Sequence, residues 1–98
     1  MPLTQEEEHL LIKNAHFVTD RMNADKPMAE SHVRVFKELF PDLFSLLMRV
    51  QPEEAFEIYE KYKSHQVYHA EMEALLSPKG KEWVINELKM IREYAESR

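Results

Sequence analysis

The sequence predicts an all-α protein, a compact antiparallel bundle of four to five helices joined by short loops. Only one residue of 98 is glycine, whereas sheet proteins need glycine in their turns and bulges. Apolar residues recur at helical spacing along most of the chain. Prolines are well tolerated in the first turn of a helix, so successive helices are expected to start near Pro27, Pro41, Pro52 and Pro78.

The composition is that of a globular protein. The 98 residues are 44% apolar and 32% charged, with a net charge of −5, and a chain of this length, residues 1–98, is expected to form a single all-helical domain. Cysteine is absent, which excludes disulfides and thiol chemistry. The chain shows neither a secretory signal nor a membrane-spanning run, so we expect a cytoplasmic protein without membrane contact.

The first helix is expected to cover residues 4–23. Thr4 and Glu7 have the spacing of a capping box, in which each side chain accepts a hydrogen bond from the other residue's backbone N–H. After this helix, Asp25 is predicted to cap a second helix that carries Pro27 in its first turn. That helix is expected to cover residues 27–39.

The stretch Val33–Val50 is the most hydrophobic of the chain, and the other helices are expected to pack around it. Pro41 either kinks a helix there or ends it and starts a new one over residues 41–50. The half from Leu43 to Val50 is apolar on nearly every side, so it requires cover on nearly every side. A chain this short is not expected to supply all of that cover, which indicates self-association or partner binding.

Two further helices are expected at residues 52–76 and 78–96. In the first, a seam with heptad spacing runs from Ala55 to Leu76. Ser77 and Pro78 are a typical cap and first-turn pair for the second. The residues expected on its solvated face are Glu82, Glu87, Lys89, Arg92, Glu93 and Glu96.

The segment around His65 is the one candidate for a metal site. On a continuous helix, His65, His69 and Glu73 would lie one turn apart on one face, where two imidazoles and a carboxylate can bind a divalent metal. The alternative is that they line a partly wet groove between helices. A metalloprotease needs glutamate directly after the first histidine, and Gln66 stands there. We therefore assign no metal and no cofactor.

Other functional classes are disfavoured by the sequence. No serine lies in a G-x-S-x-G motif, and Gly80 alone cannot form a glycine-rich phosphate loop, so we do not expect an enzyme. The basic residues are dispersed among acids, whereas nucleic-acid-binding proteins usually carry a basic patch.

The remaining hypothesis is a small acidic protein-interaction module. It would act as a regulator, adaptor or inhibitor by binding a protein partner, in one version as a protein of the phage or mobile-element type, and would form a homodimer. The alternative is a metal- or pH-responsive helical protein that uses His65, His69 and Glu73. The residues expected at the partner or dimer interface are Leu43, Phe44, Leu47, Met48, Tyr62, His65, Tyr68 and His69.

Overall fold

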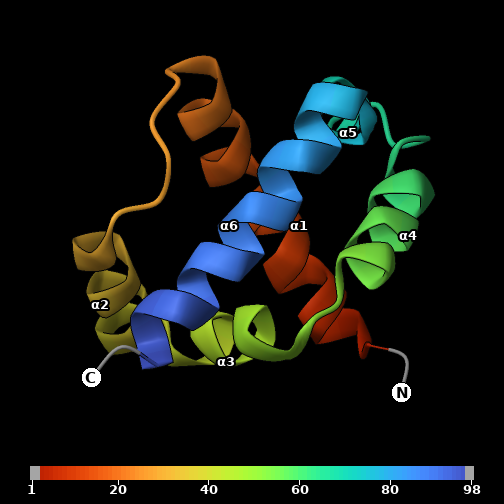
Figure 1. The fold of residues 1–98 in the computed structure, drawn as a ribbon. Helices are drawn as coiled ribbons and strands as arrows, with labels where there is room; N and C mark the ends of the chain where they lie inside the picture. The colour runs from red at the N-terminus through yellow and green to blue at the C-terminus, as the bar shows by residue number, and fades with distance from the viewer. Residues whose placement is uncertain (1–2, 97–98) are drawn as a thin grey trace.

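The computed structural model describes residues 3–96, and every regular element within that range is a helix. The prediction of an all-α chain is confirmed, but that of an antiparallel bundle of four to five helices is not. Figure 1 shows that α3 lies across one end of the molecule instead of alongside its neighbours. The helices are α1 (Gln5–Asn23), α2 (Glu30–Leu39), α3 (Pro41–Arg49), α4 (Pro52–Tyr62), α5 (His69–Leu76) and α6 (Pro78–Glu96).

The helix on which the others assemble is α6. It packs against each of the other five helices and runs diagonally across the molecule in Figure 1. Its 19 residues extend about 28 Å at about 1.5 Å per residue, long enough to reach all of them. The expectation that the other helices pack around Val33–Val50 is therefore wrong, because α4 and α5 pack on neither α2 nor α3. None of the helices within residues 3–96 has the length and apolar character needed to cross a membrane.

Two of the three helix starts predicted from capping residues are confirmed, those at Thr4 and Ser77. The Thr4 hydroxyl accepts a hydrogen bond from the Glu7 N–H at 3.2 Å, and the Glu7 carboxylate accepts one from the Thr4 N–H at 2.9 Å. At α6, the Gly80 N–H donates to the Ser77 hydroxyl at 3.1 Å. Local side-chain chemistry is thus enough to place these helix ends.

The connection between α1 and α2 differs from the prediction. Asp25 does not cap α2; its φ of 55° lies in the left-handed region that aspartate tolerates better than most residues. This turn lets the Lys26 N–H donate to the Arg21 carbonyl at 2.8 Å and so closes α1. Pro27 lies in the extended connector that follows, and α2 begins only at Glu30.

Pro41 ends one helix and starts the next. Phe40 has φ −134° and ψ 65°, outside the helical region, as expected for a residue whose backbone is restricted by a following proline. Its N–H closes α2 on the Phe36 carbonyl, and its own carbonyl accepts the first hydrogen bond of α3 from Phe44, both at 2.9 Å.

The predicted continuous helix over residues 52–76 is wrong. It is interrupted at residues 63–68. There, turns closed by hydrogen bonds between residues three apart replace the helical hydrogen bonds, as in the bond of 3.0 Å from the His65 N–H to the Tyr62 carbonyl. No proline or glycine causes this break. The break directs α5 back against α1 and α6, which fully buries Met72 and Leu75. Burial of two large apolar side chains contributes several kcal/mol and outweighs the hydrogen bonds lost in one turn.

Candidate interaction surface

The candidate metal-binding stripe is not formed, because its spacing required a continuous helix. His65 lies in the interrupted segment, with its ring centroid 5.1 Å from that of Tyr62. His69 is the first residue of α5, and its two ring nitrogens lie 2.7 Å from the Lys63 carbonyl oxygen and 2.8 Å from the Glu73 carboxylate. Within residues 3–96, no three histidine, aspartate or glutamate side chains are grouped to hold a metal ion.

Three of the predicted interface residues lie in the core. Leu43, Leu47 and Tyr62 are 6%, 1% and 7% exposed, so they offer almost no surface to a partner. The other five are accessible to different degrees. His65 and His69 are exposed, and the half-buried ones are Phe44, Met48 and Tyr68.

Leu43 and Leu47 are buried because other helices of the same chain cover α3. Helices α1, α2 and α6 all pack on α3. Arg92 of α6, expected on a solvated face, instead donates from Nε to the Met48 carbonyl at 3.0 Å and from Nη2 to the Val50 carbonyl. These bonds satisfy carbonyls that the end of α3 leaves without helical partners. The apolar excess of α3 therefore gives no argument for a dimer.

A different apolar surface is exposed, at α2. Leu39, Val35 and Phe40 are 66%, 48% and 47% exposed, and Phe17 of α1 is 44% exposed. The Phe36 ring joins them, because its centroid lies 6.4 Å from that of Phe17 and 6.2 Å from that of Phe40. We call the four exposed residues Phe17, Val35, Leu39 and Phe40 the α2 ridge.

The ridge is exposed because α2 carries more apolar residues than its packing partners cover. Helix α2 packs on α3 and α6, and these bury Val33 and Phe36. At 3.6 residues per turn, the apolar residues of α2 occupy an arc of about 160° around the helix axis, with Val35 at one edge and Val33 at the other. The sequence predicts that the other helices pack around Val33–Val50, but the width of the apolar arc of α2 indicates that part of this arc remains outside.

Two opposite charges border the ridge. Arg34 and Glu38 are one helical turn apart on the side of α2 next to Val35, and both are exposed. Arg34 forms only a loose ion pair of 3.4 Å with Glu30 within α2. Exposed pairs of this kind contribute little to stability, so the Arg34 guanidinium is free to interact elsewhere.

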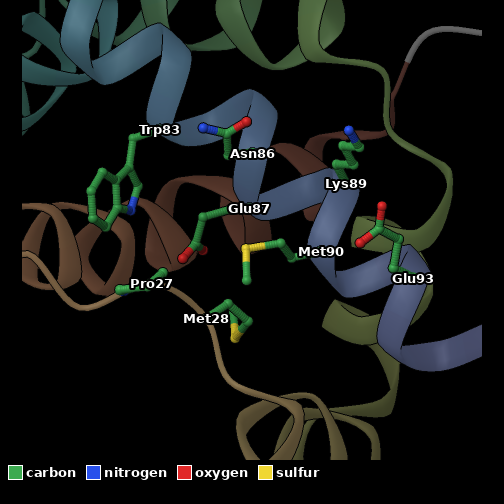
Figure 2. Close-up of a pocket in the computed structure, with 8 residues that line it drawn as sticks. All are labelled: Pro27, Met28, Trp83, Asn86, Glu87, Lys89, Met90 and Glu93. Atoms are coloured by element: carbon green, nitrogen blue, oxygen red, sulfur yellow. The ribbon is translucent and has the colours of Figure 1, made fainter. Parts of the chain in front are cut away.

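A pocket of about 270 Å³ lies between α6 and the connector that precedes α2 (Figure 2). Met28 and Met90 contribute thioether side chains, and Trp83 contributes an indole whose buried N–H makes no hydrogen bond within residues 3–96. The volume is slightly below the roughly 300–1,000 Å³ usual for small-molecule sites. The buried carboxylate at its wall, that of Glu87, is already paired within the protein.

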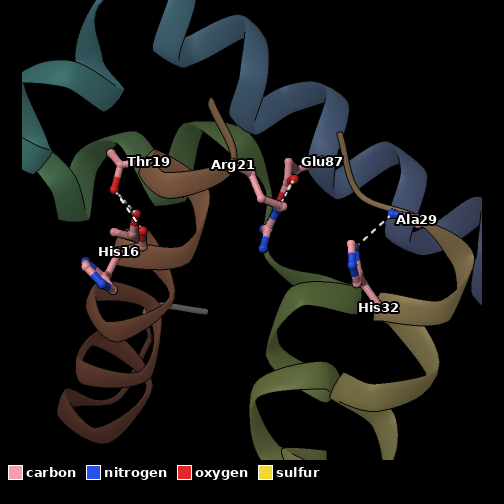
Figure 3. A network of polar contacts seen from close by, with 7 residues as sticks. His16, Thr19, Arg21, Ala29, His32 and Glu87 are labelled. Carbon is pink, nitrogen blue, oxygen red and sulfur yellow. Dashed lines mark hydrogen bonds and ion pairs between the residues drawn. The ribbon is translucent and has the colours of Figure 1, made fainter. Parts of the chain in front are cut away.

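That pair joins Arg21 of α1 to Glu87 of α6 (Figure 3). The Arg21 Nε lies 2.8 Å from Glu87 Oε1, and Nη2 donates to Oε2. Glu87 is 4% exposed, so its predicted place on a solvated face is wrong. A buried carboxylate needs such a bidentate partner, and the sequence contained no indication of which arginine would supply it.

Comparison with protein-family models, curated proteins and solved structures finds no match for this chain. The buried carboxylate that lines the pocket, that of Glu87, is already paired with Arg21, and the candidate metal stripe is broken. The α2 ridge is the clearest functional candidate, because its apolar side chains remain exposed although folding favours their burial.

Tyr59 provides a test of how the core responds to pH. Its side chain is 1% exposed, and burial, together with the nearby Glu87 carboxylate, raises the pKa of its phenol well above the ordinary value of about 10. The contribution of neutral Tyr59 to stability is therefore fully present below about pH 10 and is lost as pH rises toward the folded-state pKa.

We expect the free energy of unfolding, measured by urea denaturation, to fall above about pH 10 and to fall less steeply in Tyr59→Phe. Tyr68→Phe, at a half-buried tyrosine, is the control and should retain the fall. An equally steep fall in Tyr59→Phe would show that other groups limit alkaline stability.

Proposed function

We propose that this protein acts by binding another polypeptide, as a small acidic helical module that regulates, adapts or inhibits its partner and catalyses no reaction. The observation that carries the proposal is the α2 ridge. Contiguous apolar surface on a soluble protein is typical of an interaction site, whereas single exposed apolar side chains are ordinary. Of the six large apolar side chains exposed within residues 3–96, four form the ridge; Val67 and Ile85 are on separate elements.

The composition of the ridge also supports this proposal. Two of its members are phenylalanines, and aromatic residues are enriched at the buried centre of protein interfaces. Leu39, the most exposed of the four at 66%, lies between Val35 and Phe40 along the helix. Burying one leucine side chain contributes about 1.5–3 kcal/mol, so Leu39 is the residue whose loss should weaken binding most.

The Leu39→Asp variant is expected to lose partner binding while it keeps the fold, because Leu39 makes few contacts within the protein. The measurement is affinity capture from a lysate of the source organism with wild-type and variant baits. Any differentially captured protein is then purified and its Kd measured against each bait. We expect Leu39→Asp to raise that Kd at least about ten-fold.

The matched control is Val67→Asp, which places the same charge at an apolar residue that is 82% exposed but lies outside the ridge. It should bind like the wild type. If the purified partner binds all three proteins equally, the ridge is not the binding surface and the proposal fails. The geometry does not support the metal- or pH-responsive alternative, because His65, His69 and Glu73 do not share one helix face.

A further inference from the structure

We infer that the α2 ridge pairs with the same ridge of a second copy of this chain, with the two α2 helices antiparallel. This inference rests on the proposed function, because it names the polypeptide that covers the ridge. It differs from the dimer predicted by sequence analysis, whose central residues Leu43, Leu47 and Tyr62 are buried inside one chain.

The spacing of the ridge suits a two-fold contact. Val35 and Leu39 are four residues apart on one face of α2, about 6 Å along the helix axis. A two-fold axis between them places Val35 of each copy against Leu39 of the other. Such an isologous contact uses one patch twice and closes on itself, so both apolar side chains are covered without a second surface.

The bordering charges select the antiparallel direction. In an antiparallel pair related by a two-fold axis, the flank of α2 that carries Arg34 and Glu38 lies beside the same flank of the second copy. The residues of the two flanks then run in opposite directions. With the axis midway between Val35 and Leu39, Arg34 of one copy and Glu38 of the second copy lie within about 3 Å of the same level along the helices. Their long side chains can therefore meet, and the two-fold axis repeats this contact between Glu38 of the first copy and Arg34 of the second. Both charges are exposed and available for this contact. A parallel pair would bring this flank against the opposite, uncharged flank and would form neither ion pair.

The contact area is small, so the dimer should be weak. Helix α2 has ten residues and is about 15 Å long, which puts the contact at the low end of protein interface sizes. We therefore expect dissociation in the range of tens to hundreds of micromolar. Dimers should be detected in concentrated solution and lost on dilution.

Sedimentation equilibrium of the purified full chain tests this from about 10 µM to about 1 mM. The wild type should shift from 11.7 kDa toward twice that mass. Leu39→Asp should remain at the monomer mass, and Val67→Asp should follow the wild type. Circular dichroism of each variant checks that the helices are intact.

Charge exchange tests the direction of pairing. Arg34→Glu and Glu38→Arg should each raise the dimer Kd about ten-fold, because each turns two attractive contacts into two repulsive ones. The double variant Arg34→Glu/Glu38→Arg should recover wild-type dimerisation. An equimolar mixture of the two single variants should also associate, because one copy then presents two glutamates and the other two arginines.

Each outcome decides one point. A wild type that stays monomeric at about 1 mM overturns the second copy as occupant, yet leaves Leu39-dependent binding of another protein untouched. A dimer that survives Leu39→Asp overturns the ridge as its interface. Single charge variants that neither recover in the double variant nor associate when mixed overturn the antiparallel pairing.

Discussion

Replacing Arg21 with methionine is expected to remove about 3–5 kcal/mol from the free energy of unfolding. Methionine fills much of the same volume but leaves the Glu87 carboxylate, which is 4% exposed, without its bidentate partner. An uncompensated buried charge is among the most costly changes a core can carry. Since a domain of this size is stable by about 5–15 kcal/mol, Arg21→Met should be marginally folded at room temperature.

Urea denaturation followed by circular dichroism measures this loss, and the double variant Arg21→Met/Glu87→Leu separates charge from packing. With no charge left to bury, the double variant should recover most of the lost stability, because apolar replacements of buried ion pairs are often neutral or better. Arg34→Met, at an exposed pair, is the matched control and should cost under about 0.5 kcal/mol. A loss below about 1 kcal/mol for Arg21→Met would show that water reaches Glu87.

Replacing Gly80 with alanine is expected to cost about 3 kcal/mol or more. A Cβ at this position would overlap the Ala74 carbonyl oxygen and lie 2.6 Å from the Leu75 Cα. These are backbone atoms of α5, so the clash cannot be relieved by turning a side chain, and α5 must move away from α6. The gain of about 1 kcal/mol from the better helix propensity of alanine is too small to offset this.

Thermal unfolding, with hydrogen exchange of the α5 amides, checks this prediction. Gly80→Ala should lower the Tm and speed exchange in α5 before it affects the rest of the chain. Lys79→Ala, at the exposed neighbouring position in the same turn of α6, should change the stability by less than about 0.5 kcal/mol. A Gly80→Ala protein more stable than the wild type would show that helix propensity, and not close packing, governs this position.

The helix ends that the sequence predicts correctly are those encoded by neighbouring residues. Thr4 with Glu7 and Ser77 with Pro78 act within one helical turn, so their effect does not depend on the rest of the fold. Pro41 likewise restricts Phe40 directly, although the choice between a kink and a new start needed the structure. The candidate site could not be predicted in this way, because Phe17 and Phe36 meet across two helices.

The sequence by itself determined the helical class, most helix starts and the excess of apolar residues between Val33 and Val50, because these depend on local composition and spacing. Only the tertiary structure decided the interruption at residues 63–68, the burial of Glu87 and the exposure of Leu39. The physical reason is that each of these depends on which distant surfaces meet. Arg21 makes the Glu87 carboxylate tolerable in the core, while α3 and α6 cover only part of the apolar arc of α2.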